Sequence, residues 1–579
     1  MKRKKLLKLL SVVTASAIML AGCGGNGSSS GSGTDASSSS KSEESNAGSE
    51  SMEQTAESGD SDTEEGDGAS AAAGSITYPL NSDLTVSWYA QDGINPHEKF
   101  VDATESPFHI GLAENLGVNI EWSFPTTGAD ANTFTSTLMA DPMNLPDIMV
   151  MYAMNNANQY IEDEVIWDLT DYIQEYAPDY YAWLKSNPAY DQAMKTDNGQ
   201  YYAFGFFRED GGWNDTYLGP VVRTDWLEEC GLEIPKTISE FENVVRVFNE
   251  KYGAYFNAAD MRFKSMGFSG SFGAYGGSDA TWGWYVKDGK VGFGPSQPEW
   301  REYLKWLNKM WEDGLIDQDM TTEDDTTIKT KIHNDKCGIS YTSMGQMNNW
   351  NNERVADGKE PVWAGIPWPT GDDGTLSAVF GGPGIGTQTT VITKCADEET
   401  MKLCLQMLNY SYTEEGMLYW NYGTEGVSWE YDENGVPAFT SLVTDDKDTD
   451  PMTKYNGSTW SGPDIQATNL LYLKNSEAAI EANNTWFYIY DDEEKNLAVT
   501  SGWKWPTGVT FTTAEADELD QIAQNIPTYV SESYTAFMKG DKDVDDDAAW
   551  QEYLDGLESY NLTRILEIRQ DCYDRYLAR

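Results

Sequence analysis

Hydrophobic and polar positions change period repeatedly between residues 84 and 152. Runs rich in β-branched and aromatic residues predict strands, and the stretches between them carry the start and stop signals of helices. In chain order we expect a strand at 84–90, a helix from Pro107 to a stop at Gly117, a strand at 118–124, a helix at 129–140 and a strand at 147–152. This order predicts a parallel sheet with right-handed crossovers.

The carboxyl ends of such strands form the edge at which α/β sheets bind ligands. A QDG loop follows the first predicted strand, and the polar run AMNNAN follows the third. We therefore expect Asp92, Asn155 and Asn156 to contact a ligand. Trp88 and Tyr89 end the first strand, and strand alternation lets only one of them face that ligand.

The rest of the chain is mainly helical, with two strand-like segments. Glycine stops, Thr-x-x-Glu capping boxes and apolar stripes at helical spacing predict the helices. The predicted elements are helices at 224–231, from the capping box at Thr237, at 299–313, at 398–413, from the capping box at Thr512 towards Phe537 and at 548–579, with strands at 362–369 and 384–393. The stripe in the 299–313 helix assigns four side chains to the core: Trp300, Leu304, Leu307 and Trp311.

The first residues have the three parts of a bacterial secretion signal. A basic start is followed by a mostly apolar run from Leu6 to Leu20, which is shorter than the roughly 20 residues of a membrane-spanning helix. Leu20-Ala21-Gly22-Cys23 then resembles the lipobox, where the thiol is acylated and the chain is cut before the cysteine. We expect residues 1–22 to be a lipoprotein signal peptide and Cys23 to carry the lipid. A retained N-terminal membrane anchor is the alternative.

Residues 24–75 have the composition of a linker. They contain eleven acidic residues, one lysine and no aromatic residue, and are otherwise rich in Ser, Gly, Ala and Thr. Such a segment cannot bury enough apolar surface to offset the loss of chain entropy, so we expect it to be disordered. The expected order is therefore signal peptide, lipidated cysteine, acidic Ser/Gly linker over 23–75, and then a folded body too long for one hydrophobic core.

Composition excludes several classes of function. The net charge of −55, from 94 acids and 39 bases, argues against nucleic acid and makes an anionic ligand unfavourable. Beyond Cys23 there are five cysteines without CxxC spacing, and the three histidines form no HExxH-type pair. Neither a disulfide framework nor a metal site is indicated, and no cofactor is expected.

Six stretches of the folded part, together with the lipobox and linker, resemble the family 1 extracellular solute-binding lipoproteins of ABC importers. Within that family, the resemblance is to the large lipoproteins of Gram-positive oligosaccharide uptake. No single motif decides this, but the order and spacing do. The stretches are NLGVNIEW (115–122), FTSTLMADPMNLPDIMV (134–150), VVRTDWLEECGLEIPKTISEF (221–241), WEDGLIDQD (311–319), YTEEGMLYWNYGTEGVSWEYDENGVP (412–437) and IPTYVSESYTAFMKGD (526–541).

The resemblance implies an α/β fold of two lobes, the type II periplasmic-binding-protein-like fold, with the ligand cleft between the lobes. The implied first lobe spans 76–210 and 386–430, and the implied second lobe spans 211–385 and 431–579. The crossing segments chosen on this basis are 203–212, 379–386 and 428–435. The implied partners are an oligosaccharide and the transmembrane subunits of an ABC permease. Some members hold calcium in an acidic loop, but the matching region at 249–263 lacks alternating acids, so no metal site is carried over.

Candidate sugar-binding residues come from aromatic and polar side chains on glycine-broken loops. A flat aromatic ring suits the C–H face of a sugar, and amides or carboxylates suit its hydroxyls. Besides the three strand-end residues, the candidates are Trp88, Trp213, Trp282, Trp284, Trp350, Glu425 and Trp429. No catalytic residue is assigned and no enzyme is expected. A tethered carbohydrate-active enzyme and a peptide-binding member of the same fold remain alternatives.

Overall fold

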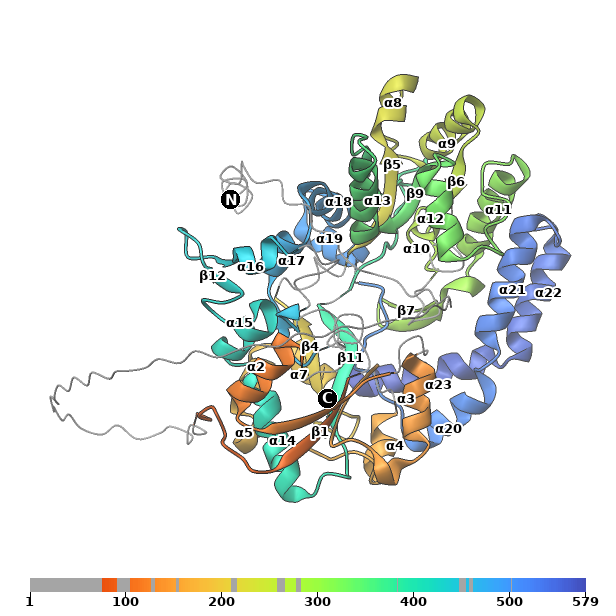
Figure 1. Cartoon of the computed structure of the whole chain (residues 1–579). Coiled ribbons are helices and arrows are strands. Elements are labelled where there is room, and N and C mark those ends of the chain that lie inside the picture. Colours follow the sequence, from red (N-terminus) through yellow and green to blue (C-terminus); the bar gives the residue numbers. More distant parts are fainter. Residues whose placement is uncertain are drawn as a thin grey trace, which may run out of the picture.

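The computed structural model describes residues 75–90, 105–125, 131–152, 156–209, 216–257, 266–276, 283–382, 384–446, 454–457, 462–500 and 502–579. The protein is a mixed α/β molecule of two lobes, each built on its own sheet (Figure 1). None of the helices in the described part of the chain combines the length and the apolar character that a membrane span needs.

The first lobe is organised around a six-stranded sheet with the order β14-β4-β11-β3-β1-β2. Its strands are β1 (Thr85–Ala90), β2 (Asn119–Ser123), β3 (Ile148–Tyr152), β4 (Phe204–Arg208), β11 (Ile385–Ile392) and β14 (Ile465–Gln466). Its helices are α2 (Pro107–Leu116), α3 (Ala131–Met139), α4 (Ala157–Glu162), α5 (Ile173–Tyr176), α6 (Pro178–Ser186), α7 (Pro188–Ala193), α14 (Glu398–Tyr410), α15 (Glu414–Tyr422) and α16 (Ser441–Thr444), with a small hairpin of β12 (Trp429–Tyr431) and β13 (Pro437–Phe439).

The predicted strand–helix–strand start of this lobe is confirmed. Strand β1 lies between β2 and β3 and is parallel to both. Helix α2 ends at Gly117, whose φ of 65° is the left-handed conformation that glycine adopts without strain. The sheet as a whole is mixed, because β11 enters from a later part of the chain and runs antiparallel to both β3 and β4.

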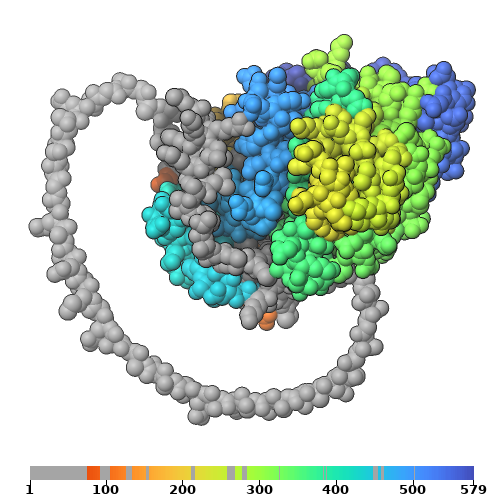
Figure 2. All heavy atoms as spheres, turned by 90° about the horizontal axis from the view of Figure 1, so that it is seen from above, coloured from red at the N-terminus to blue at the C-terminus, as the bar shows by residue number. Residues whose placement is uncertain are grey.

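The second lobe is organised around a four-stranded sheet with the order β10-β5-β9-β6. Its strands are β5 (Leu218–Arg223), β6 (Tyr255–Asn257), β9 (Cys337–Ser343) and β10 (Trp363–Gly365), with a separate hairpin of β7 (Trp284–Lys287) and β8 (Lys290–Phe293). Its helices are α8 (Thr224–Cys230), α9 (Ile238–Tyr252), α10 (Met266–Gly270), α11 (Pro298–Glu312), α12 (Asp325–His333), α13 (Met344–Ala356), α18 (Glu477–Phe487) and α19 (Glu493–Thr500). Seen from above, the late segment around α18 lies against the early elements of this lobe (Figure 2).

Four C-terminal helices complete the molecule: α20 (Thr513–Ile522), α21 (Ile526–Lys539), α22 (Asp547–Ser559) and α23 (Leu562–Leu577). Their buried side chains belong to the same hydrophobic core as the second lobe. In Figure 1 they run from α11 in the second lobe down to α3 and α4 in the first. The capping box of Thr512 and Glu515 is present as predicted, but the single long helix expected after it is two helices, α20 and α21.

Two further expectations are corrected in detail. At Thr237 the side chain accepts from the Glu240 amide, but the Glu240 carboxylate accepts from Lys236 N–H, so the cap is not fully reciprocal. In α11, Trp300 is buried with its stripe as expected, whereas Trp311 is only partly buried against the core.

The last crossing between the lobes comes later in the chain than residues 428–435. Trp429 packs with Tyr422, Ala467 and Leu470 in the first lobe. Strand β14 pairs with β4 of the first sheet, and α17 (Thr468–Lys474) then leads to the second-lobe helix α18. The predicted boundary at residue 430 therefore falls inside the first lobe. After the hairpin of β12 and β13, the chain returns to the first-lobe sheet as β14 before it crosses to the second lobe.

Candidate functional site

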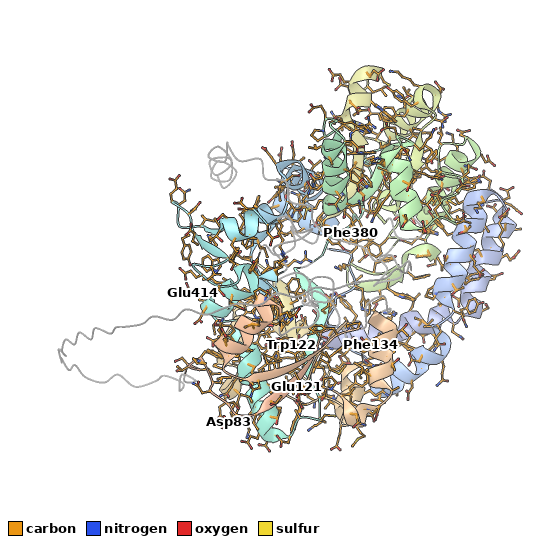
Figure 3. The ribbon with its side chains drawn as sticks, viewed as in Figure 1. Asp83, Glu121, Trp122, Phe134, Phe380 and Glu414 are labelled. Carbon is orange, nitrogen blue, oxygen red and sulfur yellow. The ribbon has the colours of Figure 1, made fainter. Side chains whose placement is uncertain are left out.

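The segments that connect the lobes lie side by side. The first leaves β4, whose Arg208 amide donates to the Gly384 carbonyl of the returning segment at 2.9 Å. Where this returning segment leaves the second lobe, Val379 N–H donates to Val499 O at 2.9 Å. The ring of Phe380, next to Val379, lies between the two lobes (Figure 3) and meets the ring of Tyr217 edge-on at 5.1 Å. The junction of the lobes is thus built from three distant parts of the sequence.

A further segment, residues 502–511, contacts both lobes; we call it the bridging segment. On the second-lobe side, Val286 of β7 donates its amide to Trp503 O at 3.1 Å. On the first-lobe side, the amide of Asn158 in α4 donates to Phe511 O at 3.0 Å. Helix α4 begins soon after β3, near the carboxyl end of that strand. The bridging segment therefore runs beside the sheet edge at which α/β folds bind ligands.

Three aromatic rings form a wall where the bridging segment meets the hairpin of β7 and β8. Trp503 and Tyr285 are inclined by 31° with centroids 5.4 Å apart, and Tyr275 lies 5.8 Å from Tyr285. The ammonium of Lys287 lies 4.2 Å from the centroid of Trp503. Trp503 and Tyr285 are each partly exposed, whereas Tyr275 is buried behind them. We call Tyr275, Tyr285 and Trp503 the aromatic wall.

Glycine and strand alternation decide which rings form this wall. The Tyr285 ring lies across its cross-strand partner Gly292, where an added Cβ would come within 2.3 Å of the ring. Along β7, Trp284 and Val286 are buried while Tyr285 and Lys287 point away from the core. Burial of the ring and the nearby negative charge of Glu299 raise the pKa of Tyr285, so its hydroxyl stays protonated.

Trp284 therefore takes the opposite place from the one predicted. It is 5% exposed and packs on Phe293 with ring centroids 4.4 Å apart. The glycine-rich stretch had suggested a loop, but residue 284 begins a strand and period-2 alternation turns its side chain inward. Tyr285, the next residue, was not predicted from the sequence. The available signal was that a strand beginning after Gly283 turns the side chains of Trp284 and Tyr285 to opposite faces.

Three other predicted tryptophans are core residues in this structure. Trp88 stacks on Trp122 at 4.9 Å, and Trp350 packs against Trp363 at 5.1 Å. Trp429 is also buried, and its indole N–H donates to the Gly423 carbonyl at 3.0 Å. The strand or helix that carries each ring turns it into the core, so none of them offers a face to a ligand.

Of the remaining predicted residues, Glu425 and Asn156 lie within the described part of the chain. Glu425 is exposed on the loop before β12, and Asn156 is partly buried at the start of α4. The other four lie outside the described residues: Asp92, Asn155, Trp213 and Trp282. Trp503 was not proposed from the sequence. The available signal was the aromatic WKW run at 503–505.

One carboxylate cluster within the described part of the chain has the spacing of a metal site. Asp317, Asp319 and Glu323 bring their oxygens within 4.8 Å of one another. Lys331 Nζ lies among them, 3.0 Å from Asp317 and 3.2 Å from Asp319, and also pairs with Glu323. The ammonium thus supplies the positive charge that these acids require.

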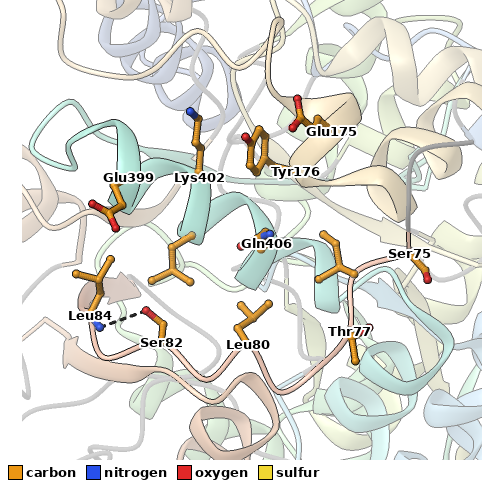
Figure 4. Close-up of a pocket in the computed structure, with 12 residues that line it drawn as sticks. Ser75, Thr77, Leu80, Ser82, Leu84, Glu175, Tyr176, Glu399, Lys402 and Gln406 are labelled. Atoms are coloured by element: carbon orange, nitrogen blue, oxygen red, sulfur yellow. Dashed lines mark hydrogen bonds between the residues drawn. The ribbon is translucent and has the colours of Figure 1, made fainter. Parts of the chain in front are cut away.

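A surface pocket of about 670 Å³ lies elsewhere, at the base of the first lobe (Figure 4). It is lined by the entering segment 75–84 and by residues of α5 and α14, among them Tyr176 and Lys402. No residue of the second lobe lines it. The pocket is therefore separate from the junction of the lobes.

The family model for bacterial extracellular solute-binding proteins matches residues 112–428, more than half of the chain. The chain belongs to this family.

Similar proteins extend the match over most of the sequence. The fructooligosaccharide ABC transporter substrate-binding protein FusA of Streptococcus pneumoniae is 24% identical over 530 residues, covering 87% of this chain and 92% of FusA. The polygalacturonan/rhamnogalacturonan-binding protein YtcQ of Bacillus subtilis is 23% identical over 413 residues, covering 66% of this chain and 73% of YtcQ. The crystal structure of the alginate-binding protein AlgQ2 superposes with a TM-score of 0.68 at 20% identity, covering 86% of this chain and 100% of that one. The last likeness shows the shared two-lobed fold.

Proposed function

We propose that this solute-binding protein is a lipid-anchored, extracytoplasmic receptor that captures a neutral oligosaccharide between its lobes and delivers it to the permease subunits of an ABC importer. Two of the similar proteins described above are named for saccharide ligands: FusA for a fructooligosaccharide, which is neutral, and YtcQ for polygalacturonan/rhamnogalacturonan, which is acidic. The observation in this chain that carries the proposal is the aromatic wall of Tyr275, Tyr285 and Trp503, which stands where the bridging segment meets the second-lobe hairpin.

The chemistry of the aromatic wall suits a sugar. Partly exposed rings offer flat apolar faces to the C–H patches of a pyranose or furanose ring. The Lys287 ammonium beside Trp503 can donate to hydroxyl oxygens at the edge of the same sugar. A wall of this kind binds without a nucleophile or a catalytic acid pair, in keeping with a binding protein rather than an enzyme.

Charge favours a neutral ligand. The chain carries −55 overall, so a polyanion approaching the junction meets a repulsive field. A neutral oligosaccharide does not. The lipobox ending at Cys23 and the acidic linker after it support a lipid anchor with the folded body held away from the membrane.

A thermal-shift screen against neutral and acidic oligosaccharides tests the ligand class. Ligand at about a hundred times its dissociation constant should stabilise the protein by about 2.7 kcal/mol. A neutral oligosaccharide should give the largest shift, and no new reducing ends should form on incubation. A best ligand that is a peptide or a uronate, or progressive release of reducing ends, would overturn the corresponding part of the proposal.

The anchor and the closure have separate tests. Cys23→Ala should release the protein into the medium or leave its precursor uncut, whereas a mature variant still bound to membranes after a high-salt wash contradicts a lipid anchor.

Small-angle scattering of the chain from Gly24 onward should show a smaller radius of gyration with saturating ligand, because the lobes rotate about their crossing segments. An unchanged radius would exclude closure.

A further inference from the structure

The three arginines of α23 have different partners. Arg564 pairs with Glu518 and Glu567, and Arg575 pairs with Asp197 and Glu515. Arg569, between them, forms no ion pair and no hydrogen bond with any described residue, and its Nε is buried without a partner. In a chain with 94 acids, a shortage of carboxylates does not explain this.

The surroundings of Arg569 are aromatic instead of acidic. Its guanidinium carbon lies 4.4 Å from the ring centroid of Trp284, 5.1 Å from Trp505 and 5.5 Å from Phe511. The helix positions three and four residues away on either side hold Ile565, Leu566, Cys572 and Tyr573, none of which is an acid. Burial lowers the pKa of Arg569 to about 10, so the group is still a cation at neutral pH.

The position of Arg569 ties it to the junction of the lobes. Trp505 and Phe511 belong to the bridging segment, and Phe511 O accepts from Asn158 at the first-lobe sheet edge. Trp284 precedes Tyr285 on β7, and strand alternation places the two rings on opposite faces, so Arg569 packs on the face of β7 opposite Tyr285. Rings that pack on a guanidinium leave its N–H groups, which lie in its own plane, to meet acceptors.

We propose that Arg569 is a specificity-determining residue whose guanidinium binds a pair of neighbouring oxygen acceptors on a sugar bound at the junction of the lobes. The guanidinium fork fits two adjacent hydroxyls of a neutral sugar or the two oxygens of a uronate carboxylate. This inference rests on the proposed function and adds a residue that hydrogen-bonds to the oxygen atoms of the ligand.

The test measures binding of nystose, a neutral oligosaccharide, and of trigalacturonate, an acidic one, by isothermal titration. Arg569→Met keeps the aliphatic stem but loses the fork, and Arg569→Lys keeps the charge but loses the paired donors. We expect Arg569→Met to weaken binding of the preferred sugar at least tenfold and Arg569→Lys to recover only part of the loss. Arg564→Met, on the exposed face of the same helix, is the matched control and should bind as wild type does.

The outcomes separate the inference from the proposed function. Circular dichroism melting of each unliganded variant first shows that it is folded. A folded wild type that binds neither these two sugars nor any oligosaccharide of the thermal-shift screen overturns the proposed function and the inference with it. If the wild type binds and both Arg569 variants bind within twofold of it, the function stands and Arg569 is only a structural cation. A preference for trigalacturonate that is lost in Arg569→Met supports the inference, assigns the acceptor pair to a carboxylate and overturns the neutral-ligand part of the proposed function.

Discussion

Arg579 and Asp197 form an ion pair in which both side chains are almost fully buried, 2% and 4% exposed respectively. Arg575 reaches the same carboxylate, with its Nε 3.0 Å from Asp197 Oδ2. Arg579 also donates to Gly508 O at 2.7 Å, in the bridging segment. This network fixes the C-terminal helices, whose core is shared with the second lobe, to the turn after α7 in the first lobe.

Removing the shared carboxylate should destabilise the whole protein. Asp197→Ala leaves the buried Arg579 without its carboxylate and Arg575 with only Glu515, and we expect a loss of about 3–5 kcal/mol in the free energy of unfolding. Urea titration followed by circular dichroism measures it. Glu518→Ala removes the partner of Arg564 in a pair that is 40–46% exposed, and should cost no more than about 1 kcal/mol. Equal losses in the two variants would show that the buried network has no special role.

Acid should weaken the same region through Glu515. Burial alone would raise the pKa of this carboxyl, but the hydrogen bonds from Arg575 and from the Thr512 amide outweigh it and hold the pKa below 4.5. A carboxyl whose pKa is lower in the folded state contributes stability above its unfolded pKa, and loses it as the pH falls through the folded pKa. The wild type should thus lose stability below about pH 4.5, and Glu515→Gln should lose less over that range. The measurement is the free energy of unfolding at a series of acid pH values, and equal slopes for both proteins would contradict the prediction.

Local sequence signals predicted the individual helices and strands of this fold better than the contacts between them. The predicted helix ends at Gly117 and Gly231 are confirmed, because each glycine adopts the left-handed conformation that ends its helix. The break between α20 and α21 did have a local signal, which the prediction missed: Asn525 is the N-cap of α21 and Pro527 stands in its first turn. The return of β14 to the first sheet depends on pairing with β4, more than 250 residues earlier, and no local pattern contains that contact.

The site was less predictable for a related reason. Glycine around Trp284 suggested a loop, but the orientation of that ring depends on where β7 begins, and a shift of one residue exchanges the buried and exposed faces. The aromatic wall and the surroundings of Arg569 bring β7 together with the bridging segment and α23. Both of these lie more than 200 residues after β7 in the sequence. Their proximity is a product of the tertiary fold.

The carboxylate cluster beside α12 offers a test of charge compensation. Lys331 supplies the cation for Asp317, Asp319 and Glu323. Lys331→Ala should lower the melting temperature, because three neighbouring acids then repel one another. Millimolar Ca²⁺ should restore part of the loss in the variant, since carboxylate oxygens are its preferred ligands, and should leave the wild type unchanged. A calcium response of the same size in both proteins would show that the ammonium does not occupy the cation position.

The aromatic wall makes the sharpest prediction about ligand binding. Tyr285 and Trp503 are partly exposed, so truncating either ring removes little core packing but takes away a stacking face. Burying a large aromatic face contributes roughly 1.5–3 kcal/mol, so Tyr285→Ala and Trp503→Ala should each raise the dissociation constant for a bound neutral glycan about tenfold or more. Their unliganded melting temperatures should stay close to that of the wild type. Trp300→Leu is the matched control, because Trp300 is 2% exposed within the second-lobe core and should lower the melting temperature while leaving the affinity of the folded protein unchanged. Isothermal titration and thermal melting on the same four proteins decide the matter, since a ring that serves only packing moves the melting temperature and a ring that stacks on sugar moves the dissociation constant.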